Sequence, residues 1–271
     1  MFVIEERDFQ EFAAYIRSNY GIHLKSAKKT LVQGRLGPLL ARLNMTSLRE
    51  YMDYVQADTT GQAATLMLNR LTTNYTFFMR EPEHFRYFKR VVLPYLERTV
   101  EDKDLRIWSA ACSTGEEPYT LAMIIAEYFS LQRDSWDTKI LATDISQKAL
   151  AFARTGIYDN GEVATLPKAW QRRYFKPYDA NRSILIERIR NEVIFANINL
   201  MKTPFPFKKK MHVIFCRNVM IYFDTETKEN LTERLYDITV PGGFLFIGHS
   251  EGLNRTKTRY KYVMPAVYRK E

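Results

Sequence analysis

Cysteine is scarce in this sequence. Cys112 and Cys216 are the two present among 271 residues, too few for a disulfide-stabilised scaffold, and they lack the spacing of metal ligands. No apolar run approaches the roughly 20 residues of a membrane-spanning helix. The N-terminal stretch MFVIEERDFQEF also lacks the basic region and apolar stretch of a signal peptide. We therefore expect a cytoplasmic protein with no direct membrane insertion.

Internal repeats and low-complexity tracts are absent as well. Hydrophobic residues make up 46% of the chain and charged residues 26%, a composition typical of a globular enzyme. The length leaves room for a Rossmann-type domain and a smaller companion domain. His84, His212 and His249 show neither metal-ligand nor catalytic-triad spacing. We predict structural or solvent-facing positions for these three histidines, and no metal site.

Acidic residues are missing between Glu11 and Glu50, although the whole chain has 31 acidic and 40 basic residues. The same interval contains Arg17, Lys25, Lys28, Lys29, Arg35, Arg42 and Arg49. A positively charged surface is expected there. The formal net charge of +9 favours an acidic partner. Charge alone leaves nucleic acid, an anionic membrane surface and an acidic protein open.

Residues 1–72 have the pattern of helices. Apolar side chains recur at spacings of three and four residues, first at Phe9, Phe12, Ala13 and Ile16 and then at Leu36, Leu39, Leu40 and Leu43. The pair Gly37-Pro38 interrupts the second series, so we expect a kink or a helix start there. An all-helical N-terminal domain is predicted.

The pattern changes near residue 105, where short apolar runs begin to alternate with amphipathic stretches. LRIWSA and KILATD are each followed by a predicted helix, and MHVIFC and GGFLFIGHS continue the series. This alternation predicts βαβ units and a parallel sheet. Between about 170 and 195, apolar and polar residues alternate around Arg190-Asn191-Glu192. That segment predicts a hairpin in a small antiparallel β subdomain.

The glycine pattern GxGxxG of dinucleotide-binding folds is missing. In its place, residues 108–118, WSAACSTGEEP, follow the first strand and precede a helix. Small residues and the unpaired N–H groups of a helix start suit a nucleotide-type ligand. Asp144 ends the next strand, where its carboxylate is placed to accept hydrogen bonds from both ribose hydroxyls of an adenosine cofactor. Taken singly, these features also fit a turn without a ligand and a helix cap.

Five motifs in order resemble those of one family. They are Leu71-Thr-Thr-Asn-Tyr-Thr-Phe-Phe-Met-Arg-Glu81, Cys112-Ser-Thr-Gly-Glu-Glu-Pro-Tyr119, Ala142-Thr-Asp144, Phe215-Cys-Arg-Asn-Val-Met-Ile-Tyr-Phe-Asp224 and Gly248-His-Ser-Glu251. Together they resemble the chemotaxis receptor methyltransferases, the CheR-type enzymes. The resemblance implies an α/β fold, a Rossmann-like class I methyltransferase sheet with an all-helical N-terminal domain. The implied domains are residues 1–72 and 73–271, the second including the antiparallel subdomain at about 170–195.

The resemblance also implies a cofactor, S-adenosylmethionine, with S-adenosylhomocysteine as product and no metal. Carried over motif by motif, the cofactor-binding residues are Asn74, Thr76, Arg80, Glu117, Asp144, Asn199, Leu200, Arg217 and Asn218. Tyr75 and Met79 depart from the family pattern at positions that vary or are aromatic in relatives. Neither is expected to impair cofactor binding.

The implied reaction is methyl ester formation on glutamate side chains of chemoreceptors. A glutamate carboxylate, with a reference pKa of about 4.3, is already ionised at neutral pH, so no general base is needed. The enzyme must align oxygen, methyl carbon and sulfur and exclude water. Arg80 and the Tyr222 hydroxyl are the predicted catalytic groups that hold the carboxylate. The structural interpretations are an ion pair of Arg80 with Glu81 or Glu83, and a core position for Tyr222.

The predicted partner is the acidic cytoplasmic methylation region of a chemoreceptor's coiled coil. Lys28, Arg35 and Arg42 are seven residues apart and on one continuous helix would share a basic face for this partner. A kink at Gly37-Pro38 would displace Arg42. The alternative is a solvent-exposed basic face that aids solubility and contacts no partner. We expect the protein to act as a monomer.

Three other functions lack support in the sequence. A nucleic-acid methyltransferase is expected to carry an Asn-Pro-Pro-aromatic segment or an RNA-binding motif, and a dehydrogenase the GxGxxG pattern. A non-catalytic module would have lost motif residues that are present here. Relatives that bind a receptor's C-terminal tail peptide carry a longer, glycine-bearing loop where this chain has the compact segment Tyr178-Asp-Ala-Asn-Arg182, so the resemblance implies no tight binding of such a peptide. For Cys112 and Cys216, at adjacent ends of neighbouring predicted strands, a regulatory disulfide and two small buried residues both stay open.

Overall fold

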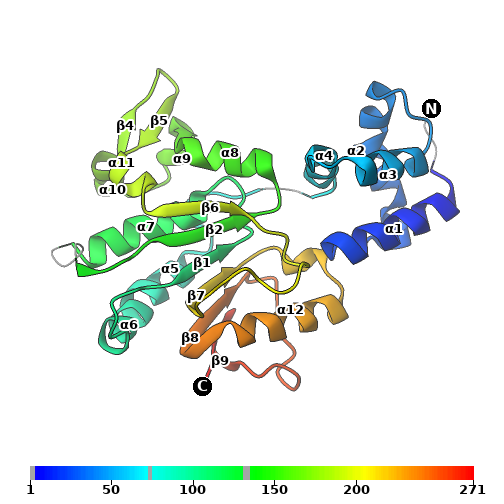
Figure 1. The fold of residues 1–271 in the computed structure, drawn as a ribbon. Helices are drawn as coiled ribbons and strands as arrows, with labels where there is room; N and C mark the ends of the chain where they lie inside the picture. Colours follow the sequence, from blue (N-terminus) through cyan, green and yellow to red (C-terminus); the bar gives the residue numbers. More distant parts are fainter. Residues whose placement is uncertain (1–3, 73–74, 131–134) are drawn as a thin grey trace.

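The computed structural model describes residues 4–72, 75–130 and 135–271. A helical N-terminal region lies to one side of a larger α/β body (Figure 1). Its helices are α1 (Glu6–Tyr20), η1 (Ser26–Lys28), α2 (Lys29–Arg42), α3 (Leu48–Ala57) and α4 (Gln62–Leu71). The buried residues of α1, Phe9, Phe12 and Ile16, recur at helical spacing. The prediction of an all-helical N-terminal domain is confirmed.

Two outcomes were predicted at the Gly37-Pro38 pair, a kink or a helix start. Helix α2 runs through the pair, so the predicted helix start is wrong. Pro38 has no N–H to donate to the carbonyl of Gly34, and one helical hydrogen bond is missing. Leu36, Leu39 and Leu40 on either side of the pair are buried. Their packing offsets the lost bond and keeps the helix continuous.

The α/β body is built on a seven-stranded sheet, in the part of the chain described, with the order β6-β2-β1-β7-β8-β10-β9. The strands are β1 (Ile107–Ala110), β2 (Ile140–Asp144), β6 (Val193–Asn197), β7 (Met211–Cys216), β8 (Thr239–Ile247), β9 (Lys261–Met264) and β10 (Val267–Arg269). The first five in this order are parallel, and β10 and β9 pair antiparallel. The carboxyl ends of the parallel strands therefore meet at one edge, where open α/β sheets bind ligands.

Helices cover both faces of this sheet (Figure 1). The helices described in the α/β body are α5 (Pro82–Tyr87), η2 (Phe88–Val92), α6 (Leu93–Thr99), α7 (Glu116–Tyr128), α8 (Gln147–Thr155), α9 (Asn160–Val163), α10 (Lys168–Tyr174), α11 (Glu187–Arg190), η4 (Met220–Tyr222) and α12 (Thr225–Asp237), of which α9 and α10 lie with the small sheet β3-β5-β4. Val213 and Phe215 of β7 pack in one core with α5–α7, whereas Ile214 and Cys216 pack in another with α12 and the N-terminal helices. The sheet is thus buried on both sides. No helix within the described ranges has the length and apolar composition needed to cross a membrane.

A second, antiparallel sheet has the order β3-β5-β4. Its strands are β3 (Ile157–Asp159), β4 (Phe175–Pro177) and β5 (Arg182–Leu185). The predicted small antiparallel element is present, but the predicted hairpin around Arg190-Asn191-Glu192 is wrong. Residues 187–190 form α11, and β6 pairs in parallel with β2 in the main sheet. Alternating apolar residues fit either kind of strand, and long-range contacts decide which partner a strand takes.

Candidate functional site

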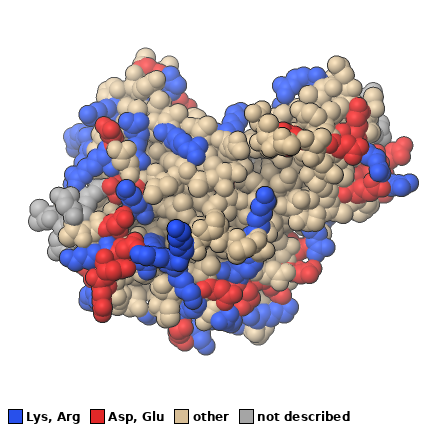
Figure 2. Space-filling view, in the orientation of Figure 1, with Lys and Arg blue, Asp and Glu red and all other residues tan. Residues whose placement is uncertain are grey.

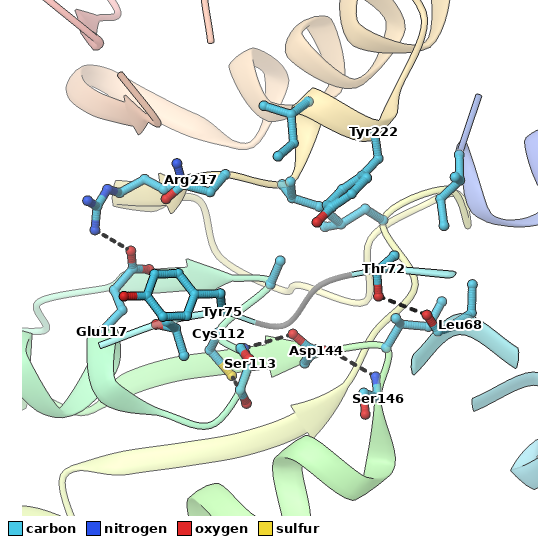
Figure 3. A pocket seen from close by; sticks show the side chains of 18 of the residues that line it. Leu68, Thr72, Tyr75, Cys112, Ser113, Glu117, Asp144, Ser146, Arg217 and Tyr222 are labelled. Carbon is cyan, nitrogen blue, oxygen red and sulfur yellow. Dashed lines mark hydrogen bonds and ion pairs between the residues drawn. The ribbon is translucent and has the colours of Figure 1, made fainter. Parts of the chain in front are cut away.

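A cavity of about 310 Å³ opens at the carboxyl ends of the parallel strands (Figure 3). Its lining includes the predicted cofactor residues Thr76, Arg80, Glu117, Asp144, Asn199, Leu200, Arg217 and Asn218 and the predicted catalytic residue Tyr222. The remaining predicted residue, Asn74, lies outside the described residues. Tyr20, Ile22 and Leu68 of the N-terminal region also line the cavity. The fold thus brings these positions together, and their role in binding stays a prediction.

The turn after β1 shapes one wall of the cavity. Ala111 and Ser113 have φ angles of 66° and 49°, in the left-handed region. Gly115, just before α7, has a φ of +97°, and a Cβ there would lie 2.9 Å from the Cβ of Ala153. Glycine is therefore required at this position. The turn brings Ala111, Ser113 and Glu117, at the start of α7, into the cavity lining.

Asp144 joins two loops at this edge. Its Oδ2 accepts the N–H of Ser113 and its Oδ1 accepts the N–H of Ser146, both at 2.8 Å (Figure 3). Burial raises the pKa of Asp144, although these backbone N–H groups favour the charged form. The cap of α8 is Ser146, whose hydroxyl accepts from the N–H of Ala149, so the helix-cap interpretation of Asp144 is wrong. The carboxylate has acceptor capacity left for a ribose hydroxyl.

A buried ion-pair network forms another wall. The guanidinium of Arg217, in a side chain 2% exposed, donates to Glu117 Oε2 at 2.8 Å and to Glu81 Oε2 at 3.0 Å. The other oxygen of Glu117 accepts the Ser109 hydroxyl at 2.7 Å. A buried guanidinium needs such partners because an unpaired buried charge is costly. Glu117 and Arg217 thereby present fixed, opposite charges beside the cavity.

Glu81 and Glu251 lie behind this wall, and neither was among the predicted site residues. Glu81 also accepts from the Asn218 side chain at 3.1 Å and from the N–H of His249 at 3.2 Å. Burial alone would raise the pKa of Glu81, but the Arg217 charge and these hydrogen bonds lower it overall. Glu251 accepts the N–H groups of Asn218 and Ile221 at 2.9 and 3.0 Å. Glu81 and Glu251 end two of the motifs that resemble the family. Their place in these motifs could have identified them as site residues from the sequence.

Arg80 and Tyr222, the two predicted catalytic residues, both line the cavity. Glu81 pairs with Arg217 and Glu83 with Arg86, so neither carboxylate proposed as a structural partner holds Arg80. The Arg80 guanidinium instead donates to the Tyr75 carbonyl at 2.7 Å. Tyr222, on η4, is half-buried, packs against the core that contains α12, and also points into the cavity (Figure 3), so both interpretations of Tyr222 stay open.

The histidines near the site form a small cluster with Glu81. His84 is fully buried, with Nδ1 3.4 Å from Glu81 Oε2, and its ring centroid lies 4.6 Å from that of His249. Burial and the Arg217 charge lower the pKa of His84 to about 3. Candidate ligand atoms of Glu81, His84 and His249 lie within 4.8 Å of one another, but the Arg217 charge opposes a cation there. That the protein needs no metal stays a prediction.

Of the three basic residues predicted to contact the partner, Arg35 and Arg42 lie seven residues apart on the continuous helix α2, and Lys28 directly precedes it. Lys28 ends η1 and precedes α2, and it is exposed, as is Arg42. Arg35 is half-buried and donates to the Leu71 carbonyl at 2.7 Å, at the C-terminal end of α4. Free carbonyls and the helix dipole favour a cation at that end. Arg35 therefore has a structural role, and Lys28 and Arg42 are the exposed candidates.

Cys112 and Cys216 are both buried and unbridged. Cys112 belongs to the core with α5–α7, and Cys216 to the core on the other side of the sheet. Burial raises the pKa of both thiols. The structure favours two small buried residues over a regulatory disulfide.

Comparison with known proteins extends over both parts of the chain. A family model described as "CheR methyltransferase, all-alpha domain" matches residues 7–72, and one described as "CheR methyltransferase, SAM binding domain" matches residues 74–268. A chemotaxis protein methyltransferase of Borreliella burgdorferi is 37% identical over 270 residues, covering 98% of this chain and 95% of the relative. The chemotaxis protein methyltransferase of Escherichia coli is 32% identical over 268 residues, covering 98% of this chain and 90% of the relative.

Proposed function

The chain belongs to the CheR methyltransferase family, and from this premise we propose that it transfers a methyl group from S-adenosylmethionine to glutamate side chains of chemoreceptors. The products are glutamate methyl esters and S-adenosylhomocysteine. The observation that carries the proposal is the cavity at the ligand edge of the sheet, where Asp144, the Glu117–Arg217 pair and Tyr222 converge. The partner would be the cytoplasmic methylation helices of a receptor.

The cavity residues fit the cofactor's chemical groups. Asp144 keeps acceptor capacity for the ribose hydroxyls, since a carboxylate has about four acceptor positions and the backbone N–H groups of Ser113, Ile145 and Ser146 use three of them at most. Glu117 and Arg217 offer a negative and a positive group, which suits the ammonium and carboxylate of a methionine moiety. S-adenosylmethionine supplies a methyl group on a cationic sulfonium. The left-handed turn at Ala111 and Ser113 lets a ligand approach the backbone closely.

The protein's contribution to the reaction is alignment of the acceptor. The attacking glutamate is already a carboxylate at neutral pH, so no side chain has to remove a proton. Arg80, tethered by the Tyr75 carbonyl, and the Tyr222 hydroxyl hold the two carboxylate oxygens so that one faces the methyl carbon. The enclosing walls reduce the water that would otherwise solvate the carboxylate.

Incubation with labelled S-adenosylmethionine and membranes that contain candidate receptors tests this function. Label should appear on a receptor band and be released by mild base, because a methyl ester is hydrolysed there and an N-methyl group is not. Receptors whose methylation-region glutamates are replaced by alanine are the matched control and should stay unlabelled. Label transferred to RNA in a parallel reaction, with none on any receptor, would contradict the proposal.

A further inference from the structure

The end of α1 lies against loops of the α/β body that carry site residues. Tyr20 and Ile22 line the cavity directly. Between them, Gly21 has a φ of +72°, and a Cβ at this position would lie 2.5 Å from the Sδ of Met201. Glycine lets the chain leave α1 in contact with the loop after β6. The N-terminal region is thus a wall of the cavity and more than a separate docking module.

The loop that carries Tyr222 is bound to this segment at successive positions. The N–H of His23 donates to the Tyr222 carbonyl at 2.7 Å. Ile22 forms an isolated antiparallel bridge with Phe223. At the next position of the loop, the Asp224 side chain pairs with Arg17 of α1. The Tyr222 backbone is therefore fixed from the N-terminal region.

Arg17 makes that side-chain bond, and its Nε lies 2.5 Å from Asp224 Oδ2. Asp224 also caps α12, because its Oδ1 accepts the N–H of Thr227 at 2.8 Å. The Arg17 side chain is 47% exposed, whereas its partners Asp224 and Glu226 are 17% and 74% exposed, so the Glu226 pair adds little to global stability and the Asp224 pair is the one that matters for the loop. Loss of the Arg17 charge should loosen the Tyr222 loop without unfolding the protein.

The same segment holds a second site residue. The Nδ2 of Asn199 donates to the Asn19 carbonyl at 2.8 Å. Its Oδ1 accepts the N–H of Met201 at 2.9 Å, which shapes the loop that follows β6. Residues 17–23 therefore contact both the predicted catalytic loop and a predicted cofactor loop.

From these contacts we propose that residues 17–23 belong to the catalytic site, and that Arg17 is a positioning residue that sets the Tyr222 hydroxyl against the acceptor carboxylate through Asp224. The inference rests on the proposed methyl transfer and gives the helical region a second task beside partner contact. Arg17 itself does not line the cavity, so its proposed action on the reaction is indirect.

Arg17→Met keeps the aliphatic stem and removes the charge, and Arg17→Lys restores a charge. Arg7→Met is the matched control, since Arg7 lies on the same helix, is 83% exposed and pairs with Glu11 of α1. Arg17→Met should lower kcat by about tenfold through misplacement of Tyr222, with KM for receptor and the calorimetric Kd for S-adenosylmethionine unchanged. Arg17→Lys should recover most of kcat. Hydrogen exchange should show faster exchange of the His23 amide in Arg17→Met than in Arg7→Met.

Equal kcat values in Arg17→Met and Arg7→Met would overturn the inference. A rise in KM for receptor without a fall in kcat would also overturn it, because Arg17 would then act in docking. If the wild-type protein methylates no receptor, the proposed function fails. Hydrogen exchange then still tests whether Arg17 holds the Tyr222 loop against residues 17–23. Unchanged protection of the His23 amide in Arg17→Met refutes that positioning role, and lost protection upholds it.

Discussion

At the scale of single residues, Asp144 connects two loops by hydrogen bonds and is also the predicted ribose acceptor. Its two oxygens bind the N–H groups of Ser113 and Ser146, which ties the turn after β1 to the start of α8. A substitution at Asp144 therefore changes the loops as well as the cavity. A useful control has to separate these effects.

Asp144→Ala should weaken binding of S-adenosylmethionine and S-adenosylhomocysteine by roughly 10- to 100-fold, the range expected for lost hydrogen bonds to a charged acceptor. Isothermal titration calorimetry measures this directly. Ser146→Ala is the control, because it removes the cap of α8 and costs about 1 kcal/mol of stability without touching the ribose acceptor. Equal affinity in Asp144→Ala and wild type would remove Asp144 from the site.

Tyr222→Phe should lower kcat on the order of tenfold and leave the Kd for S-adenosylmethionine nearly unchanged. The lost hydroxyl is proposed to contact the acceptor carboxylate, so its effect belongs to the transition state more than to cofactor binding. Steady-state kinetics with receptor membranes, combined with calorimetry, separates the two. Tyr262→Phe on β9, an exposed tyrosine outside the cavity lining, should be silent. Wild-type turnover in Tyr222→Phe would exclude a catalytic hydroxyl.

At the scale of elements, the start of α7 carries an unusual carboxyl group. Glu116 is 3% exposed, and burial raises its pKa from 4.5 to about 7, although the Thr114 hydroxyl bonds favour the charged form. The folded state thus binds this proton more tightly than the unfolded state. The free energy of unfolding should fall as pH rises from 4.5 and level off above about 7.

Glu116→Gln removes this titration and keeps the side-chain shape. Its free energy of unfolding relative to wild type should increase between about pH 5 and pH 8, on the order of 2 kcal/mol. Urea unfolding at the two pH values measures the difference. Glu101→Gln, at an exposed position, should show no such trend. A difference between Glu116→Gln and wild type that is the same at both pH values would mean that Glu116 does not titrate in this range.

At the scale of the whole molecule, the N-terminal helices and the α/β body share a core, and both carry charged side chains on their surface. The N-terminal helices share one continuous apolar core with a face of the sheet, so the two regions are packed together. The formal net charge is +9, and acidic side chains are interspersed with basic ones on the face that Figure 2 shows. Figure 2 shows basic side chains on both lobes, on either side of a central face with few charges. Long-range attraction of an acidic helical partner is expected from such a surface.

Lys28→Glu combined with Arg42→Glu should raise KM for receptor by about tenfold and leave cofactor affinity unchanged. Added salt should reduce wild-type activity more than that of the double variant, because exposed charges are screened within about 10 Å at 0.1 M ionic strength. Lys208→Glu with Lys261→Glu is a control of equal net charge, with exposed residues before β7 and at the start of β9. If both pairs behave alike across a salt series, only net charge matters and these positions do not recognise the partner.

The sequence by itself determined the type of most elements and the place of the site. Helical spacing of Phe9, Phe12 and Ile16 predicted α1 because a periodic apolar face is a local property of the chain. Asp144 and the 215–224 motif ended predicted strands, and the carboxyl ends of parallel strands meet at one edge. The candidate site could therefore be assembled from motif positions before any distance was known.

Only the tertiary structure decided which partners the residues take. It placed β6 in the main sheet instead of a hairpin, directed Arg35 to the end of α4, and paired Glu81 with Arg217. It also set Arg17 against Asp224. Each of these contacts joins residues far apart in the chain. Local patterns say which side chains are apolar or charged, but the choice among distant partners depends on how complete faces pack and on which charges burial leaves to be neutralised.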